Sequence, residues 1–93
     1  MGRSWKGVKA ERDTPGVRAG YDRARRAFDF AEQVRNLRDQ AGISQMELAR
    51  RMGTSQSAIA RLEGGGTMPT LDTLERVAAA LGAELVVELR AAG

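Results

Sequence analysis

The chain has 93 residues and a net charge of +3, and it contains neither cysteine nor histidine. A chain of this length forms one small domain with a modest core. Without cysteine or histidine it lacks disulfides, the usual zinc ligands, and the usual nucleophile and general base of hydrolytic enzymes. We therefore expect no catalytic residue, no metal site and no cofactor. No apolar run is long enough to span a membrane and the basic start lacks a secretory core, so we expect a cytoplasmic protein.

The positive charge is concentrated near the N-terminus. Residues 1–26 hold eight Lys or Arg and three acids, whereas residues 27–93 hold seven Arg and nine acids. Residues 34–63 have a mild excess of positive charge, with five Arg and three acids. This distribution fits a moderate electrostatic attraction to phosphate, which a dimer would strengthen.

Residues 1–20 are rich in glycine and basic side chains and poor in apolar ones. A D-T-P-G turn at Asp13 to Gly16 lies within them, so we expect a flexible basic arm. Trp5 is an isolated aromatic residue in this arm. It either docks on a partner protein or nucleic acid, or belongs to a poorly packed leader.

A helical period of apolar residues begins at about Tyr21 and ends at Gly42, a natural C-cap. The second half of this predicted helix must cover the rest of the domain, while its first half extends beyond the domain. We expect the aromatic residues of the first half to contact either a second subunit or another protein. These residues are Tyr21, Phe28 and Phe30.

Residues 45–64 have the pattern of two short helices that cross at a steep angle. Ser44, with Glu47 three residues later, predicts a capping box at the start of the first helix. Ala49 is small enough to let the two helices approach closely. Gly53 can adopt the left-handed conformation that ends the first helix and turns the chain.

The second helix of this motif starts at about Gln56, and either Thr54 or Ser55 caps it. Ile59 and Leu62 are three residues apart and point into the core. The opposite face consists of Gln56, Ser57, Ala60 and Arg61.

The glycines at 64–66 form a flexible loop. No strand precedes them and no G-K-S/T follows, so they are not a phosphate-binding loop. Thr70 then predicts the cap of a further helix, which ends at Gly82. The inner face of that helix consists of Leu71, Leu74, Val77, Ala78 and Leu81.

Residues 83–90 change from a helical to an alternating period, which predicts a single β-strand. The apolar positions on one side of this strand are Leu85, Val87 and Leu89. A lone strand leaves its backbone groups unpaired. We therefore expect it to pair with its own copy across a homodimer, or with a sheet edge of a different protein.

The segment from Val34 to Leu81 resembles the Xre/Cro family of phage-repressor-like DNA-binding domains. It reads V-R-N-L-R-D-Q-A-G-I-S-Q-M-E-L-A-R-R-M-G-T-S-Q-S-A-I-A-R-L-E, then the loop, then P-T-L-D-T-L-E-R-V-A-A-A-L-G. The resemblance covers about half of the chain. It implies an all-α, lambda-repressor-like helix-turn-helix bundle. In this chain the helical domain covers residues 21–82, including a long N-terminal helix, and a single C-terminal strand follows it.

The same resemblance implies that the second motif helix enters the major groove of double-stranded DNA. Gln56 and Ser57 would read bases, and Gln45 would hold a phosphate and support Gln56. Arg61, one turn further along, either reads guanine or holds a phosphate. Three further arginines are candidates for contact with the DNA backbone or for surface ion pairs. They are Arg38, Arg50 and Arg51.

The leader and the strand together resemble the HigA-type antitoxins of toxin–antitoxin pairs. Such an antitoxin represses its own operon and neutralises a small ribonuclease toxin of the RelE/HigB type. The resemblance implies a homodimer on an inverted-repeat operator, with a small basic toxin protein as partner. The alternative is a free-standing Xre-type regulator without a toxin. A protein-interaction adaptor is a further alternative, which would leave the polar face of the second motif helix without a purpose.

Overall fold

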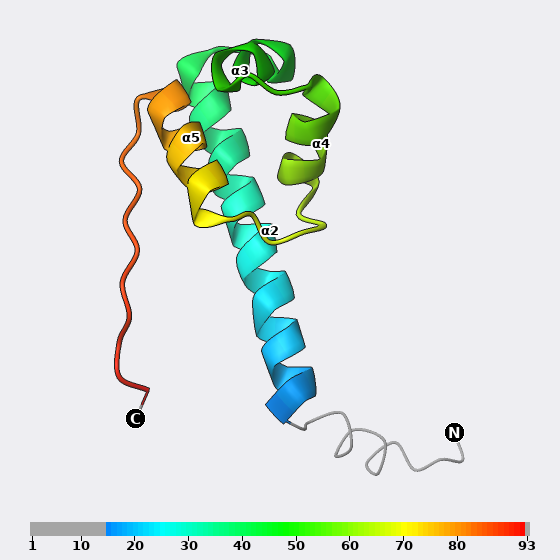
Figure 1. Cartoon of the computed structure of the whole chain (residues 1–93), viewed down its shortest axis with the longest axis vertical. Helices are drawn as coiled ribbons and strands as arrows, with labels where there is room; N and C mark the ends of the chain where they lie inside the picture. The colour runs from blue at the N-terminus through cyan, green and yellow to red at the C-terminus, as the bar shows by residue number, and fades with distance from the viewer. Residues whose placement is uncertain (1–14, 93) are drawn as a thin grey trace, which may run out of the picture.

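The computed structural model describes residues 15–92, which fold into four α-helices and no β-strand. The helices are α2 (Pro15–Ala41), α3 (Gln45–Met52), α4 (Gln56–Gly64) and α5 (Leu71–Leu81). Helices α3, α4 and α5 surround the second half of α2, and the first half of α2 extends beyond them (Figure 1). None of these helices is long and apolar enough to cross a membrane.

Each of the three short helices begins at a hydroxyl side chain and ends at a glycine. The ends at Gly53 and Gly82 were predicted, whereas Gly64, predicted to lie in the loop, is the last residue of α4. The side-chain oxygens of Ser44, Ser55 and Thr70 each accept a hydrogen bond from the backbone N–H three residues later, at 3.0 or 3.1 Å. These bonds satisfy N–H groups that the helix itself leaves free. Of the two caps predicted for α4, Ser55 is the one used. The three terminal glycines, all left-handed, are Gly53, Gly65 and Gly82.

The hydrophobic core lies where the three short helices pack on α2. Its buried residues are Val34, Leu48, Ala49, Met52, Ile59 and Val77. Ala49 is buried where α3 contacts α4, which confirms the reason for a small side chain at this position. Along α2, burial begins at Ala27, so only the second half of the predicted apolar stripe is covered.

Helix α2 begins at Pro15, six residues before the predicted start. Proline is favoured in a first helical turn, where its missing N–H costs nothing. Residues 15–20, which were predicted to belong to the flexible arm, are therefore helical. The rest of the predicted arm, including Trp5, lies outside the described residues.

The predicted C-terminal β-strand is wrong. Residues 83–92 are not helical, and the described chain offers them no second strand, so they form no sheet hydrogen bonds. The alternating apolar residues of this segment also do not share one buried side. Leu85 is half-buried, but the side chains of Val87 and Leu89 are 59% and 99% exposed. In Figure 1 the segment runs alone beside the helices as far as the C-terminus.

Gly65 is the point at which the first half of α2 contacts the helix-turn-helix motif. It ends α4 with a φ of 74°, a conformation that other residues adopt at a cost of about 1–2 kcal/mol. A Cβ atom at this position would lie 2.7 Å from Cδ1 of Phe28. The ring of Phe28 therefore packs directly on the end of α4, although 61% of this residue is exposed.

We predict that Gly65→Ala lowers the free energy of unfolding by about 1–2 kcal/mol from the backbone conformation alone, and further through the clash with Phe28. Thermal unfolding followed by circular dichroism measures the loss. Gly66→Ala is the matched control, because Gly66 has no positive φ and no atom within 4 Å of the added Cβ. Gly53→Ala controls for the backbone term, because Gly53 has a φ of 68° and no atom within 4 Å of an added Cβ, and a Gly65→Ala loss no larger than that of Gly53→Ala would contradict the contact.

Candidate nucleic-acid interface

The outer face of α4 is polar and exposed. Gln56, Ser57, Ala60 and Arg61 all lie on it, while Ile59 and Leu62 face the core, as predicted. Among residues 15–92, the side chains of Gln56, Ser57 and Arg61 have no hydrogen-bond or ion-pair partner. The structure thus brings the three predicted base-reading residues together on one accessible helix face.

Helix α3 carries a cluster of three charged side chains on its surface. The carboxylate of Glu47 accepts hydrogen bonds from Arg50, at 2.6 and 2.9 Å, and from Arg51, at 3.0 Å. These bonds from Arg50 and then Arg51 lower the pKa of Glu47 to about 2. Arg51 also donates to the carbonyl oxygen of Ala80 at 3.1 Å, which joins α3 to the end of α5.

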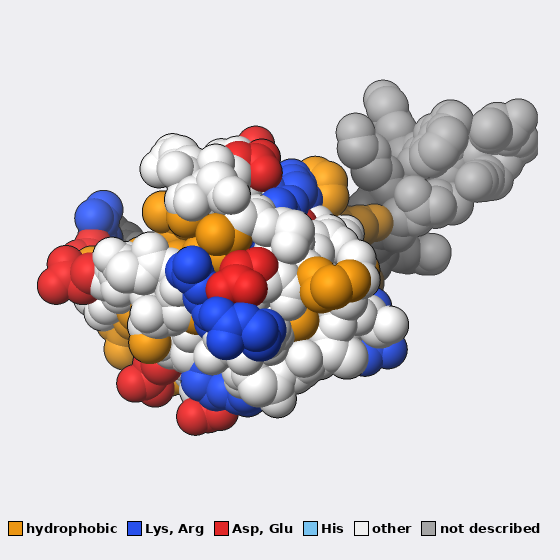
Figure 2. Space-filling model, turned by 90° about the horizontal axis from the view of Figure 1, so that it is seen from above, with side chains coloured by type: hydrophobic (Ala, Val, Ile, Leu, Met, Phe, Trp, Pro, Cys, Tyr) orange, Lys and Arg blue, Asp and Glu red, His pale blue; other side chains and the backbone are white. Residues whose placement is uncertain are grey.

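The capping box predicted for α3 is therefore only half formed. Ser44 caps the helix, but Glu47 turns to the two arginines rather than back to the cap. Seen from above, basic and acidic side chains lie next to one another on the face over α3 (Figure 2). This face is a mixed-charge surface and not a continuous basic patch.

A buried carboxylate, not predicted from the sequence, lies behind this surface. The side chain of Glu63 is 3% exposed. Its oxygens accept hydrogen bonds from Nε and Nη2 of Arg38, at 2.6 and 3.0 Å, and from Nε2 of Gln45, at 3.0 Å. Arg35 donates to the backbone carbonyl of Glu63. One residue of α4 is thereby tied to both α2 and α3.

Burial is the largest single influence on the pKa of Glu63, and it acts to raise that pKa. The hydrogen bonds from Arg38 and Gln45, with the charges of Arg38 and Arg35, outweigh it, so the pKa lies below the ordinary glutamate value. The hydrogen bond to Glu63 likewise raises the pKa of Arg38. Both groups are therefore charged at neutral pH.

Two predicted phosphate contacts, Arg38 and Gln45, take part in this internal network. The side chain of Arg38 is only 15% exposed and also donates to the carbonyl of Ile43 at 2.9 Å. Arg50, by contrast, is 71% exposed. The sequence contained a signal for the network: Glu63 follows the core residue Ile59 by four positions, so it lies on the inner face of α4 and requires a cation.

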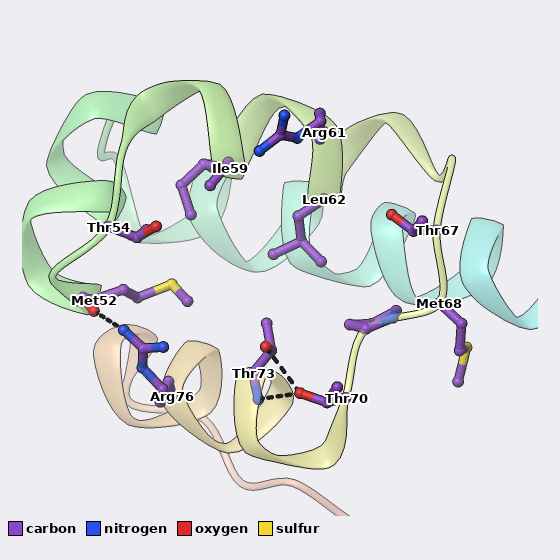
Figure 3. Close-up of a pocket in the computed structure, with 12 residues that line it drawn as sticks. Met52, Thr54, Ile59, Arg61, Leu62, Thr67, Met68, Thr70, Thr73 and Arg76 are labelled. Carbon is purple, nitrogen blue, oxygen red and sulfur yellow. Dashed lines mark hydrogen bonds between the residues drawn. The ribbon is translucent and has the colours of Figure 1, made fainter.

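An open groove of about 300 Å³ separates α4 from the start of α5. Ile59 and Leu62 point toward its interior in Figure 3. Arg76, on α5, donates to the backbone carbonyl of Met52 and so holds α5 against the end of α3. Among the described residues, no group of three or more acidic side chains is placed to hold a metal ion.

Of the three aromatic residues predicted to contact another protein, Tyr21 and Phe28 share one face of α2, whereas Phe30 lies on another. Tyr21 and Phe28 are 63% and 61% exposed and lie two helical turns apart on the first half of α2. Phe30 is half-buried, and it lines a hollow of about 60 Å³ together with Leu85 and residues of α5.

We predict that Glu63→Gln destabilises the fold by about 3 kcal/mol or more, because Arg38 then keeps a mostly buried charge whose remaining counterion is the exposed carboxylate of Asp39, at 3.5 Å. That loss corresponds to a fall in Tm of roughly 12–24 °C for a domain of this size. Glu47→Gln, which removes a surface carboxylate from two exposed arginines, is the matched control and should change Tm far less.

The pH dependence of Tm tests the same network. Because the pKa of Glu63 is lowered in the folded state, its stabilisation is complete above the ordinary glutamate pKa. This stabilisation is lost as the pH falls through the lowered value. The difference in Tm between wild type and Glu63→Gln should therefore narrow at acidic pH. A difference that stays constant from pH 7 to pH 3 would count against the ion pair.

Comparisons with known proteins agree with this geometry. A family model described as a helix-turn-helix domain matches residues 29–92. A relative from Haemophilus influenzae, named an uncharacterized HTH-type transcriptional regulator, is 48% identical over 54 residues, which are 57% of this chain and 55% of that protein. A relative of the same name from Methanothermobacter thermautotrophicus is 38% identical over 56 residues, which are 60% of this chain and 81% of that protein. The chain thus spans about half the length of the first relative.

Two solved structures are similar to this fold. The restriction-modification controller protein C.AhdI from Aeromonas hydrophila matches with a TM-score of 0.64 and 30% identity, over 68% of this chain and 91% of its own. A chain of a toxin–antitoxin module from Streptococcus pneumoniae matches with a TM-score of 0.51 and 37% identity, over 96% of this chain and 94% of its own. The resemblance seen in the sequence is confirmed, and the chain belongs to the helix-turn-helix domain family.

Proposed function

We propose that this chain is a sequence-specific DNA-binding transcriptional repressor. The observation that carries the proposal is the outer face of α4, where three polar side chains are exposed and have no partner within the described part of the chain, while the inner face is fixed in the core. The family match and the two relatives named as transcriptional regulators support it.

In this proposal α4 lies in the major groove of DNA. Gln56 pairs with N6 and N7 of adenine, and Ser57 bonds an adjacent base edge. Arg61 pairs with O6 and N7 of guanine or holds a phosphate. Gln45 lies in the first turn of α3, whose free backbone N–H groups suit a phosphate oxygen.

Arg50 and Arg51 supply the phosphate contacts of α3. Arg38 does not share this role, because its side chain is held by Glu63. The chain acts as a dimer, with two copies of α4 in successive major grooves about 34 Å apart on an inverted repeat. Dimerisation doubles the modest basic charge of each motif.

We further propose that the repressor is the antitoxin of a toxin–antitoxin pair and neutralises a small basic ribonuclease. The similarity to the Streptococcus pneumoniae module supports this, since it extends over nearly the whole chain and includes regions beyond the motif. A free-standing regulator is the second candidate. The higher TM-score of the restriction-modification controller favours it, although that similarity covers only 68% of this chain.

Substitutions on the two motif helices should separate base reading from phosphate contact. Gln56→Ala should lose about 1–3 kcal/mol of discrimination at one base pair of each half-site. Arg50→Ala should weaken all DNA alike and reduce the slope of affinity against salt by about one. Fluorescence anisotropy with operator and scrambled duplexes at several salt concentrations measures both effects.

Arg25→Ala is the control for Arg50→Ala, because Arg25 is an equally exposed arginine that lies on the first half of α2. It should leave binding of both duplexes nearly unchanged. If Gln56→Ala lowered binding to operator and scrambled DNA by the same factor, its base-reading role would be wrong.

The antitoxin role predicts a partner that co-purifies in fixed proportion. The tagged chain, recovered from its native cells, should carry a small basic protein that only denaturant releases, as seen by intact-mass analysis. Tyr21→Ala should weaken that complex without changing DNA binding, because Tyr21 is exposed and far from α4 along α2. Recovery of the chain with its own copy alone would favour the free-standing regulator.

A further inference from the structure

We propose that Ala60 reads the methyl group of a thymine in each operator half-site. This inference rests on the proposed function, because it assumes that α4 lies in the major groove. It adds to that function a specificity determinant and a base identity. The evidence is the position of Ala60 on α4 and the chemistry of its neighbours.

Ala60 lies near the middle of the face that α4 presents to solvent. A helix turns by about 100° per residue, so Ala60 is about 40° from Gln56 and about 100° from Arg61 around the axis. The two long polar side chains are therefore at the edges of the face, and Ala60 lies between them. Both Ala60 and its neighbour Ser57 are exposed.

The side chain of Ala60 is apolar on an otherwise polar face. Its methyl group is not covered by its own chain, and DNA that binds α4 would remove it from water. The 5-methyl group of thymine is the apolar group that base pairs present in the major groove, and alanine is a suitable contact for it. Amino and carbonyl edges of the other bases would instead lose water against Ala60 without gaining a hydrogen bond.

The distance along α4 places this thymine relative to the base pair that Gln56 reads. Four residues of helix rise by about 6 Å, and successive base pairs are about 3.4 Å apart. The thymine should therefore lie within about two base pairs of the adenine paired with Gln56. The proposal thus predicts where in the half-site the contacted thymine lies, as well as that one is contacted.

The test replaces one thymine at a time by deoxyuridine, which lacks only the methyl group. The probe is the duplex that the wild-type protein selects from a random library, and anisotropy measures its affinity. Each half-site should contain one thymine whose replacement matters. Replacing that single thymine should weaken wild-type binding about fourfold, the contribution of one buried methyl group. Ala60→Gly should bind the thymine and deoxyuridine duplexes equally well.

Ala79→Gly controls for the helix-weakening effect of glycine, because Ala79 is an exposed alanine of α5 outside the DNA-binding face. It should retain the fourfold discrimination. If no deoxyuridine substitution weakens the wild type, or if Ala60→Gly responds as the wild type does, the inference is overturned while specific binding stands. If the selected and scrambled duplexes bind equally well, the proposed function fails, and this inference fails with it.

Discussion

The arrangement of the motif depends on one buried carboxylate. Glu63 projects from the inner face of α4 and is held by Arg38 of α2 and Gln45 of α3. The two hydrogen bonds from the fork of Arg38 compensate much of the cost of removing Glu63 from water, and they restrict the angle between α2 and α4. We infer that this buried ion pair matters more for fixing one arrangement of the helices than for net stability.

This carboxylate also determines which way α4 faces. Ile59 and Glu63 are one turn apart, and both are buried, so the residues on the opposite side of α4 must face solvent. A rotation that buried Gln56 would have to expose Ile59 and break the ion pair between Glu63 and Arg38. The orientation of the polar face that we propose for DNA is therefore set by Ile59 and Glu63. Both residues point away from that face.

Features controlled by local chemistry could be predicted from the sequence, whereas features that depend on distant partners could not. Ser44, Ser55 and Thr70 cap helices through bonds to residues three positions away, so the starts of the three short helices were predicted correctly, whereas the start of α2 was not. The strand prediction failed because alternation reports polarity but says nothing of a pairing partner. Glu63 was missed because its partner Arg38 is 25 residues away in the sequence.

The mixed charge on α3 limits what its arginines can contribute. Arg50 and Arg51 share the carboxylate of Glu47, so a phosphate that binds them competes with an existing ion pair. The gain in affinity is then the difference between two similar interactions, and it is smaller than for an unpaired arginine. Such a surface favours readout by α4 over non-specific attraction to the backbone.

The contact between Phe28 and Gly65 joins the surface that we propose for a protein partner to the helix that we propose for DNA. The ring lies on the end of α4, and more than half of the residue remains exposed. A protein bound to that ring therefore touches the terminus of the helix assigned to DNA. Thermodynamic linkage requires the coupling to be reciprocal: by whatever factor the bound protein changes the affinity for DNA, DNA changes the affinity for that protein. Under the proposed function, a partner that binds at Phe28 and changes the position of α4 would make occupancy of the operator respond to the concentration of that partner.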